Sequence, residues 1–178
     1  THDLVDKIKT VPGVETAFNR YLDTGTLEFN DRLEIGFAAS VPEGEDRKIF
    51  YDMINLKMMQ GRALKEGDGR KLMLGYSFSE KDTFGKAIKA GDSVLVNGAK
   101  FDVVGIIEKK GSFLFDGGVF INEGQLLYGI KDEDKEVNII AIKVKNEDEI
   151  AQVKERIEKV MRKERGVKEG DEDFSIQT

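Results

Sequence analysis

The sequence contains no cysteine and a single histidine, His2. The absence of cysteine excludes disulfides, thiolate nucleophiles, zinc fingers and iron–sulfur ligation. With one histidine and no cysteine, neither a Ser-His-Asp triad nor a Cys-His dyad can be assembled. His2 lies beside the first residue, and we interpret it as part of a frayed chain end without a catalytic role.

Long hydrophobic runs are also missing. A membrane-spanning helix requires about 18 or more consecutive apolar residues, whereas the longest apolar runs, near Ile139–Ile142 and Val103–Val104, cover only a few positions. No secretory signal is visible, and the sequence opens on Thr1 without a methionine. This opening predicts that the chain is one piece of a longer protein.

An excess of basic residues is the third feature that the sequence lacks. It has 28 Lys and Arg against 34 Asp and Glu, a net charge of −6, and the basic residues are interspersed with acidic ones. A nucleic-acid groove needs clustered cations that displace counterions, and anionic lipid headgroups repel an acidic surface. The composition therefore predicts a globular domain that does not bind nucleic acid.

Nucleotide and metal motifs are not found. Gly67-Asp68-Gly69 and Gly117-Gly118 lack the Gly-Lys-Ser/Thr of a phosphate loop. Asp132-Glu133-Asp134 resembles the start of a calcium loop but lacks its central glycine and bidentate glutamate, so we interpret it as a solvated acidic turn. Four acids lie beside glycines without the apolar surroundings that tune a carboxyl group for acid–base catalysis: Glu66, Asp68, Asp92 and Asp116. The sequence therefore predicts no catalytic residue, no cofactor and no metal.

Hydrophobic periodicity divides the chain into short helices and strands. The most regular pattern is a helix capped by Asn146 and Glu149 and ended by Gly166. Val137–Val144 is nearly all apolar and predicts a central strand buried on both faces. The other expected helices cover residues 3–9, 47–56, 77–84 and 122–127. The other expected strands cover residues 14–21, 26–29, 33–41, 71–75, 93–96, 100–108, 119–121 and 174–177.

Two short segments are the most informative. Asn97-Gly98 lies between two strand patterns and predicts a type I′ hairpin turn, because both central residues of that turn need positive φ. Phe113, Leu114 and Phe115 form an apolar stretch between glycines and are the candidate contact residues. Two interpretations of this stretch stay open: a buried strand, or an exposed loop whose hydrophobic tip contacts a partner or a lipophilic ligand.

The order of several motifs resembles the extracytoplasmic domain of MacB/FtsX-type ABC transporter permeases. Ile8–Val14, which ends in Pro-Gly-Val, resembles the family's opening, and Gly61-Arg62 resembles the turn before its small subdomain. Leu72–Ile107 resembles that subdomain, with its Gly-Asp, strand, turn and Phe-x-Val-Val-Gly-Ile string. Phe174-Ser175-Ile176 resembles the final strand, which leads to the second membrane helix.

The resemblance implies a two-lobed α+β fold. Residues 1–56 and 119–178 would form a porter-like βαβ lobe, and residues 57–118 would form an inserted small α/β lobe. In the family this domain lies between the first and second of four transmembrane helices. We therefore expect Thr1 and Thr178 at the same end of the domain, because packed helices lie only about 8–10 Å apart.

The resemblance also implies an extracytoplasmic location and no enzymatic activity. The expected partners are the flanking transmembrane helices of the same full-length chain, an ATP-binding subunit on the cytosolic side and a second permease protomer. The domain would transmit ATP-driven motion and contact substrate or partner outside the membrane. The alternative is a free-standing soluble ligand-binding domain of similar fold.

Overall fold

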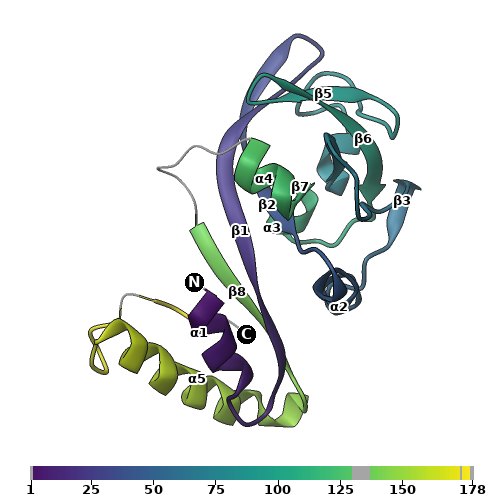
Figure 1. The fold of residues 1–178 in the computed structure, drawn as a ribbon. Helices are drawn as coiled ribbons and strands as arrows, with labels where there is room; N and C mark the ends of the chain where they lie inside the picture. The colour runs from purple at the N-terminus through teal and green to yellow at the C-terminus, as the bar shows by residue number, and fades with distance from the viewer. Residues whose placement is uncertain (1, 130–136, 173, 177–178) are drawn as a thin grey trace. The chain divides into compact units, whose positions relative to one another are not determined.

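The computed structural model describes residues 2–129, 137–172 and 174–176 and has an α+β fold, as expected (Figure 1). The chain forms two compact units. Unit 1 consists of Thr1–Asn19 and Ile140–Thr178, and unit 2 consists of Arg20–Ile139.

Short helices and strands alternate along the chain. The helices are α1 (His2–Lys9), α2 (Glu45–Met53), α3 (Phe113–Asp116), α4 (Glu123–Gly129) and α5 (Ile150–Arg165), with 3₁₀ turns η1 (Tyr76–Ser79) and η2 (Glu147–Glu149). The strands are β1 (Val14–Phe29), β2 (Arg32–Val41), β3 (Met58–Gly61), β4 (Lys71–Leu74), β5 (Ser93–Val96), β6 (Ala99–Ile107), β7 (Val119–Asn122) and β8 (Val137–Val144).

The strands of unit 2 close into a barrel. β1 pairs with β2 and β5, and the series continues through β6, β4 and β7 back to β2. The β2–β7 and β4–β6 pairs are parallel, and the other pairs of the ring are antiparallel. β3 pairs with β6 outside this ring. Closure gives each strand of the ring two neighbours and creates an enclosed face that carries the core.

β1 and β2 form a long hairpin around Asn30 and Asp31. Both turn residues have positive φ, 51° and 56°, as a type I′ turn requires. The pairing runs without interruption over residues 22–29 and 32–39. The break that the sequence predicts between residues 21 and 26 is therefore wrong. Hydrogen bonds to β2 keep these polar and glycine residues extended, although their local β-propensity is low.

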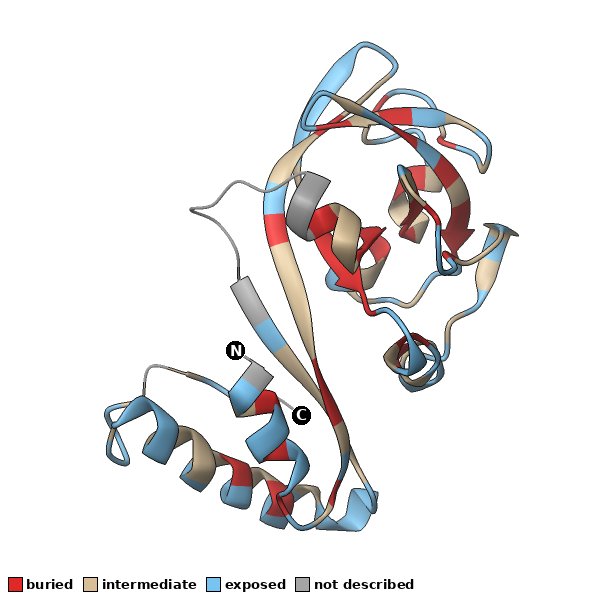
Figure 2. Cartoon of the chain, in the orientation of Figure 1, coloured by how far each residue is buried: buried red, intermediate tan, exposed pale blue. Residues whose placement is uncertain are grey.

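Alternate residues of the strands build the core of the barrel. On most strands the core residues are two positions apart, which is the spacing of side chains on one face. The strand residues of this core are Leu27, Ala38, Leu72, Leu74, Val94, Val96, Phe101, Val103, Ile106, Val119 and Ile121. Figure 2 shows buried residues in red, and β7 is red along its length; most residues of β4 are also buried. The segments that connect the strands add Phe78, Phe84, Ile88 and Leu126.

Unit 1 has small cores in which α1 and α5 meet parts of β1 and β8. Val153 and Ile157, one turn apart on α5, are buried, whereas most other α5 positions are half-buried or exposed (Figure 2). Gly13 has a φ of 93°, and a Cβ at this position would lie 2.5 Å from Cγ2 of Val153. This close approach explains the glycine before β1.

The predicted ends of α5 are confirmed at Asn146 and Gly166, but Glu149, expected at the capping-box position, makes no cap hydrogen bond with its side chain. The side chain of Asn146 accepts a hydrogen bond from the N–H of Asp148 at 3.0 Å, and it caps the turn η2 that leads into the helix. Gly166 follows the helix with a φ of 66° in the left-handed region.

Three expected elements differ from the structure. β8 lies at the end of the sheet order beside β1, and Ile139 is 42% exposed, so the expected central strand with two buried faces is wrong. The helix expected over residues 77–84 is wrong, because the turn η1 is followed by irregular structure. Residues 174–176 form no strand, and Gln177 lies outside the described residues. Ile176 still packs against the core around Val153, so tertiary burial and not strand pairing fixes it.

The boundaries of the two units differ from those of the expected lobes. Residues 20–56 and 119–139 group with residues 57–118 rather than with the chain ends. The physical reason is strand pairing: β2 pairs with β7, and β7 pairs with β4, so segments expected in different lobes share one barrel. α1 and residues 174–176 both belong to unit 1, whereas Thr1 and Thr178 lie outside the described residues.

Candidate functional site

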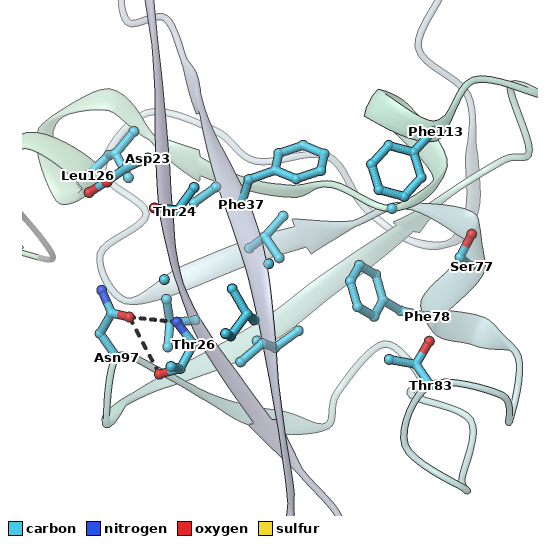
Figure 3. Close-up of a pocket in the computed structure, with 18 residues that line it drawn as sticks. Asp23, Thr24, Thr26, Phe37, Ser77, Phe78, Thr83, Asn97, Phe113 and Leu126 are labelled. Atoms are coloured by element: carbon cyan, nitrogen blue, oxygen red, sulfur yellow. Dashed lines mark hydrogen bonds between the residues drawn. The ribbon is translucent and has the colours of Figure 1, made fainter. Parts of the chain in front are cut away.

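Unit 2 contains a cavity of about 250 Å³ where the barrel wall is incomplete. β7 pairs with β2 only along residues 38–41. Over residues 32–37, β2 has β1 on one side and no ladder partner among the described residues on the other. Side chains from outside the strands line the cavity as well, among them Phe78 from η1 and Phe113 from α3 (Figure 3).

Two glycines face each other across the hairpin beside the cavity, and one of them leaves open space. Gly25 and Gly36 are register partners on β1 and β2, and both line the cavity. A Cβ on Gly36 would meet no atom within 4 Å, so this position opens onto empty space. A Cβ on Gly25 would lie 2.4 Å from Oδ1 of Asn97, the oxygen that accepts the N–H of Thr26 at 2.8 Å (Figure 3).

The cavity wall is mainly apolar, and its mouth lies at the surface. Leu27, Val96 and Leu126 are buried lining residues. Ile35 and Phe113 line the cavity as well, but they are 83% and 79% exposed, so they mark the mouth. The rings of Phe37 and Phe113 approach each other with centroids 5.9 Å apart. An apolar wall with an exposed apolar mouth is typical of a binding cavity.

One acidic residue lines this apolar cavity. Asp23 is 6% exposed, and its Oδ1 atom has no hydrogen-bond partner among the described residues. It is paired in register with Ala38, a core residue, so its side chain lies on the inner face of the hairpin. The sequence prediction missed Asp23 because it assigned residues 22–25 to a break between strands. The available signal was an aspartate two residues before a glycine, in phase with the buried Leu27.

The expected contact residues lie on and beside the mouth of the cavity. Phe113, Leu114 and Phe115 form the short helix α3, so the buried-strand interpretation is wrong. Leu114 is 60% exposed, and Phe113 lines the mouth. Phe115 is half-buried and stacks on Phe120 with ring centroids 6.1 Å apart. The structure thus presents two of the three side chains to solvent and packs the third.

The loop that leads into α3 is held by Asp116. This buried aspartate accepts hydrogen bonds from the N–H of Lys110 at 2.8 Å and from the N–H of Gly111 at 2.9 Å. Asp116 at the end of α3 therefore holds the backbone that precedes the exposed Phe113.

The other turn acids have structural partners. Asp68 is ion-paired with Arg62, and Asp92 accepts the N–H of Lys89 at 2.9 Å. Glu66 accepts the N–H of Gly44. Within residues 2–129, 137–172 and 174–176, no group of three or more His, Asp or Glu residues could hold a metal ion. Asp132-Glu133-Asp134 lies outside the described residues.

No helix in the described part of the chain is both long enough and apolar enough to cross a membrane.

Comparison with solved structures shows which known domains share this fold. The fold is similar to the extracellular domain of the noncanonic ABC-type transporter YknZ from Gram-positive bacteria, with a TM-score of 0.68, 16% identity, and coverage of 98% of this chain and 89% of that one. It is also similar to the periplasmic region of MacB from Actinobacillus actinomycetemcomitans, with a TM-score of 0.64, 15% identity, and coverage of 94% and 75%. The chain thus shares the fold of these two domains.

The sequence comparison identifies the family. The family model described as the MacB-like periplasmic core domain matches residues 1–160, and the chain belongs to this family. An uncharacterized ABC transporter permease from Methanocaldococcus jannaschii is 29% identical over 177 residues, which cover 98% of this chain and 42% of that protein. The chain thus spans less than half the length of that permease. It is an extracytoplasmic core domain of a MacB-type ABC transporter permease, as the motif order implies.

Proposed function

We propose that this domain transmits ATP-driven motion from the membrane part of its permease to a contact outside the membrane. The observation that carries the proposal is the family match over residues 1–160, together with the permease relative that aligns along 98% of the chain. In this proposal the flanking transmembrane helices and a cytosolic ATP-binding subunit supply the movement. The domain itself performs no catalysis and needs no cofactor.

The connections between the two units support a mechanical role. The chain passes from unit 1 to unit 2 at residues 19–20, inside β1, and returns at residues 139–140, inside β8. Both connections are therefore extended strands rather than loops. A strand has fewer accessible backbone conformations than a loop.

Phe113 and Leu114 are the proposed contact residues of this domain. They are 79% and 60% exposed, and Ile35 beside the same cavity mouth is 83% exposed. Three large exposed apolar side chains in one unit offer contact area for a second permease protomer or an external partner. The half-buried Phe115 serves as an anchor of α3 and not as a contact residue.

Single cysteines provide a direct test of this contact, because the domain contains none of its own. Phe113→Cys or Leu114→Cys would be introduced into the full-length permease, co-expressed with its ATP-binding subunit, and membranes would be treated with a thiol cross-linker. A cross-linked permease dimer would identify the second protomer, and a mixed adduct would identify an external partner. Lys81→Cys, an exposed position elsewhere in unit 2, is the control. If cross-linking at Phe113 and Leu114 is no stronger than at Lys81, these two residues do not form the contact.

The proposal that the domain itself binds no nucleotide has its own test. Calorimetric titration of the isolated chain with ATP and Mg²⁺ should release no binding heat, because the proposal assigns the nucleotide to a separate subunit. Binding at micromolar concentration would contradict the proposal.

A further inference from the structure

The buried carboxyl group of Asp23 is unusual for its surroundings. Its Oδ1 atom is shielded from water and receives no hydrogen bond from any described residue. A buried carboxylate oxygen that receives no hydrogen bond is unfavourable, and such atoms in folded proteins usually have a donor or bind a ligand. Among the described residues, no ion pair or hydrogen bond is made to the side chain of Asp23.

The neighbouring cation does not neutralise this carboxylate. Arg20 lies three positions earlier on β1, and residues an odd number apart in a strand point to opposite faces. Its guanidinium stacks over the ring of Phe50 at 4.2 Å and donates to the carbonyl oxygen of Ser40 at 3.4 Å. The charge on the inner face of the hairpin therefore has no counterpart in the described part of unit 2.

The cavity beside Asp23 has the size of a small ligand. It measures about 250 Å³, whereas an apolar cavity of about 150 Å³ is enough to hold a benzene molecule. Pockets for drug-sized ligands begin near 300 Å³, so the space suits one ring or one short alkyl chain. Ser77 also lines the cavity and carries a hydroxyl group.

We propose that this cavity binds a small organic monocation, a primary amine with a compact apolar body, whose ammonium group pairs with Asp23. The apolar body fills the space that Gly36 leaves open, beside Leu27, Val96 and Leu126. The amine enters at the mouth beside Ile35 and Phe113. An organic anion is excluded, because its charge would meet that of Asp23 in an apolar site. The site lies entirely within unit 2 and does not depend on the proposed mechanical role.

Three compounds of equal length test the proposal on the complete 178-residue chain: hexylamine, 1-hexanol and hexanoate. Isothermal titration calorimetry should show hexylamine bound at least about tenfold more tightly than 1-hexanol, because a hydrogen bond to a charged group is stronger than one between neutral groups. Hexanoate should not bind. In ¹H–¹⁵N spectra the largest shifts caused by hexylamine should fall on the amide signals of Gly25 and Gly36.

Four variants separate charge from shape. Asp23→Asn should bring the affinities for hexylamine and 1-hexanol to the same value, whereas Asp31→Asn removes an equal charge at the exposed hairpin turn and should leave the difference unchanged. Gly36→Val should abolish binding of both compounds, and Gly36→Ala should weaken it by a smaller factor, because a Cβ at this position projects into open space. A cooperative thermal unfolding transition shows that each variant is folded.

Several results would overturn the proposal. Equal binding of hexylamine and 1-hexanol by the unaltered chain would show an apolar cavity without charge selection. Undetectable binding of hexylamine, or amide shifts located away from Gly25 and Gly36, would show that the cavity is not an amine site. Retained hexylamine affinity in Asp23→Asn would lead to the same conclusion. If the cross-linking test of the contact residues fails but the affinity for hexylamine still depends on Asp23, the mechanical proposal is lost and the amine site is retained.

Discussion

Arg62 holds Asp68 through two parallel hydrogen bonds: Nη1 donates to Oδ2 at 2.7 Å, and Nη2 donates to Oδ1 at 3.1 Å. The same carboxylate accepts the N–H of Lys65 at 3.0 Å. Asn122 at the end of β7 donates to the carbonyl oxygens of Lys65 and Asp68 at 3.1 and 3.0 Å. One ion pair therefore shapes the loop before β4, and one amide ties that loop to the barrel.

The stability of the domain should depend on pH through Asp68. The hydrogen bonds from Arg62 are the main reason that the pKa of Asp68 is lowered from 3.8 to about 2. The folded state therefore binds fewer protons than the unfolded state between these values, and stability rises with pH across this window. The contribution, about 1–2 kcal/mol, should be complete above about pH 4 and be lost as the pH falls toward 2.

Urea unfolding at a series of pH values measures this effect. Asp68→Asn should be less stable than the unaltered chain at pH 6, and the difference should shrink toward pH 2. Asp82→Asn, at an exposed position of the same unit, is the control and should follow the unaltered chain. A stability difference for Asp68→Asn that is the same at pH 2 and pH 6 would contradict the ionic role of the pair.

A matched pair of glycine substitutions should separate backbone strain from steric overlap. Gly13 and Gly91 have nearly equal φ values of 93° and 97°, but only at Gly13 would a Cβ collide, with Val153. Both alanine variants suffer the left-handed strain of about 1–2 kcal/mol. Gly13→Ala should lose at least about 1 kcal/mol more, because α5 must shift to make room. Equal melting temperatures for the two variants would show that the collision is relieved without cost.

The two kinds of phenylalanine on α3 should differ in their effect on stability. Phe113→Ser, at a side chain 79% exposed, should change the free energy of unfolding by less than about 0.5 kcal/mol. Phe115→Ser should cost about 1–3 kcal/mol, because it removes a half-buried ring stacked on Phe120. Thermal unfolding of the isolated chain compares them directly. A large loss in Phe113→Ser would assign this residue to the core and withdraw it from the contact surface.

Asp23→Leu should stabilise the unliganded domain. The substitution replaces a buried carboxylate that lacks a partner with an apolar side chain, and the adjoining cavity has room for the added volume. We expect a gain of about 1–3 kcal/mol in the free energy of unfolding, measured in urea at neutral pH. Asp31→Leu at the exposed turn should give no such gain. A destabilised Asp23→Leu would indicate that the carboxylate has a partner in the folded state.

The sequence by itself determined the features that depend on neighbouring residues. The turn at Asn97-Gly98 forms with φ values of 47° and 79°, because few residue pairs tolerate two positive φ angles. The 3.6-residue period of α5 and the stop at Gly166 were likewise readable, since both arise within a few turns of one helix. The order of short motifs along the chain was sufficient to indicate the family.

Only the tertiary structure decided the continuity of β1, the edge position of β8 and the boundaries of the units. Each depends on which distant strand supplies hydrogen bonds, and local propensity carries no information about that partner. The cavity and the unpaired Asp23 arise in the same way. Gly25 and Gly36 are eleven positions apart in the chain and become neighbours only through the register of the hairpin. That register also turns Asp23 toward the core, because a shift of one residue would place it on the opposite face.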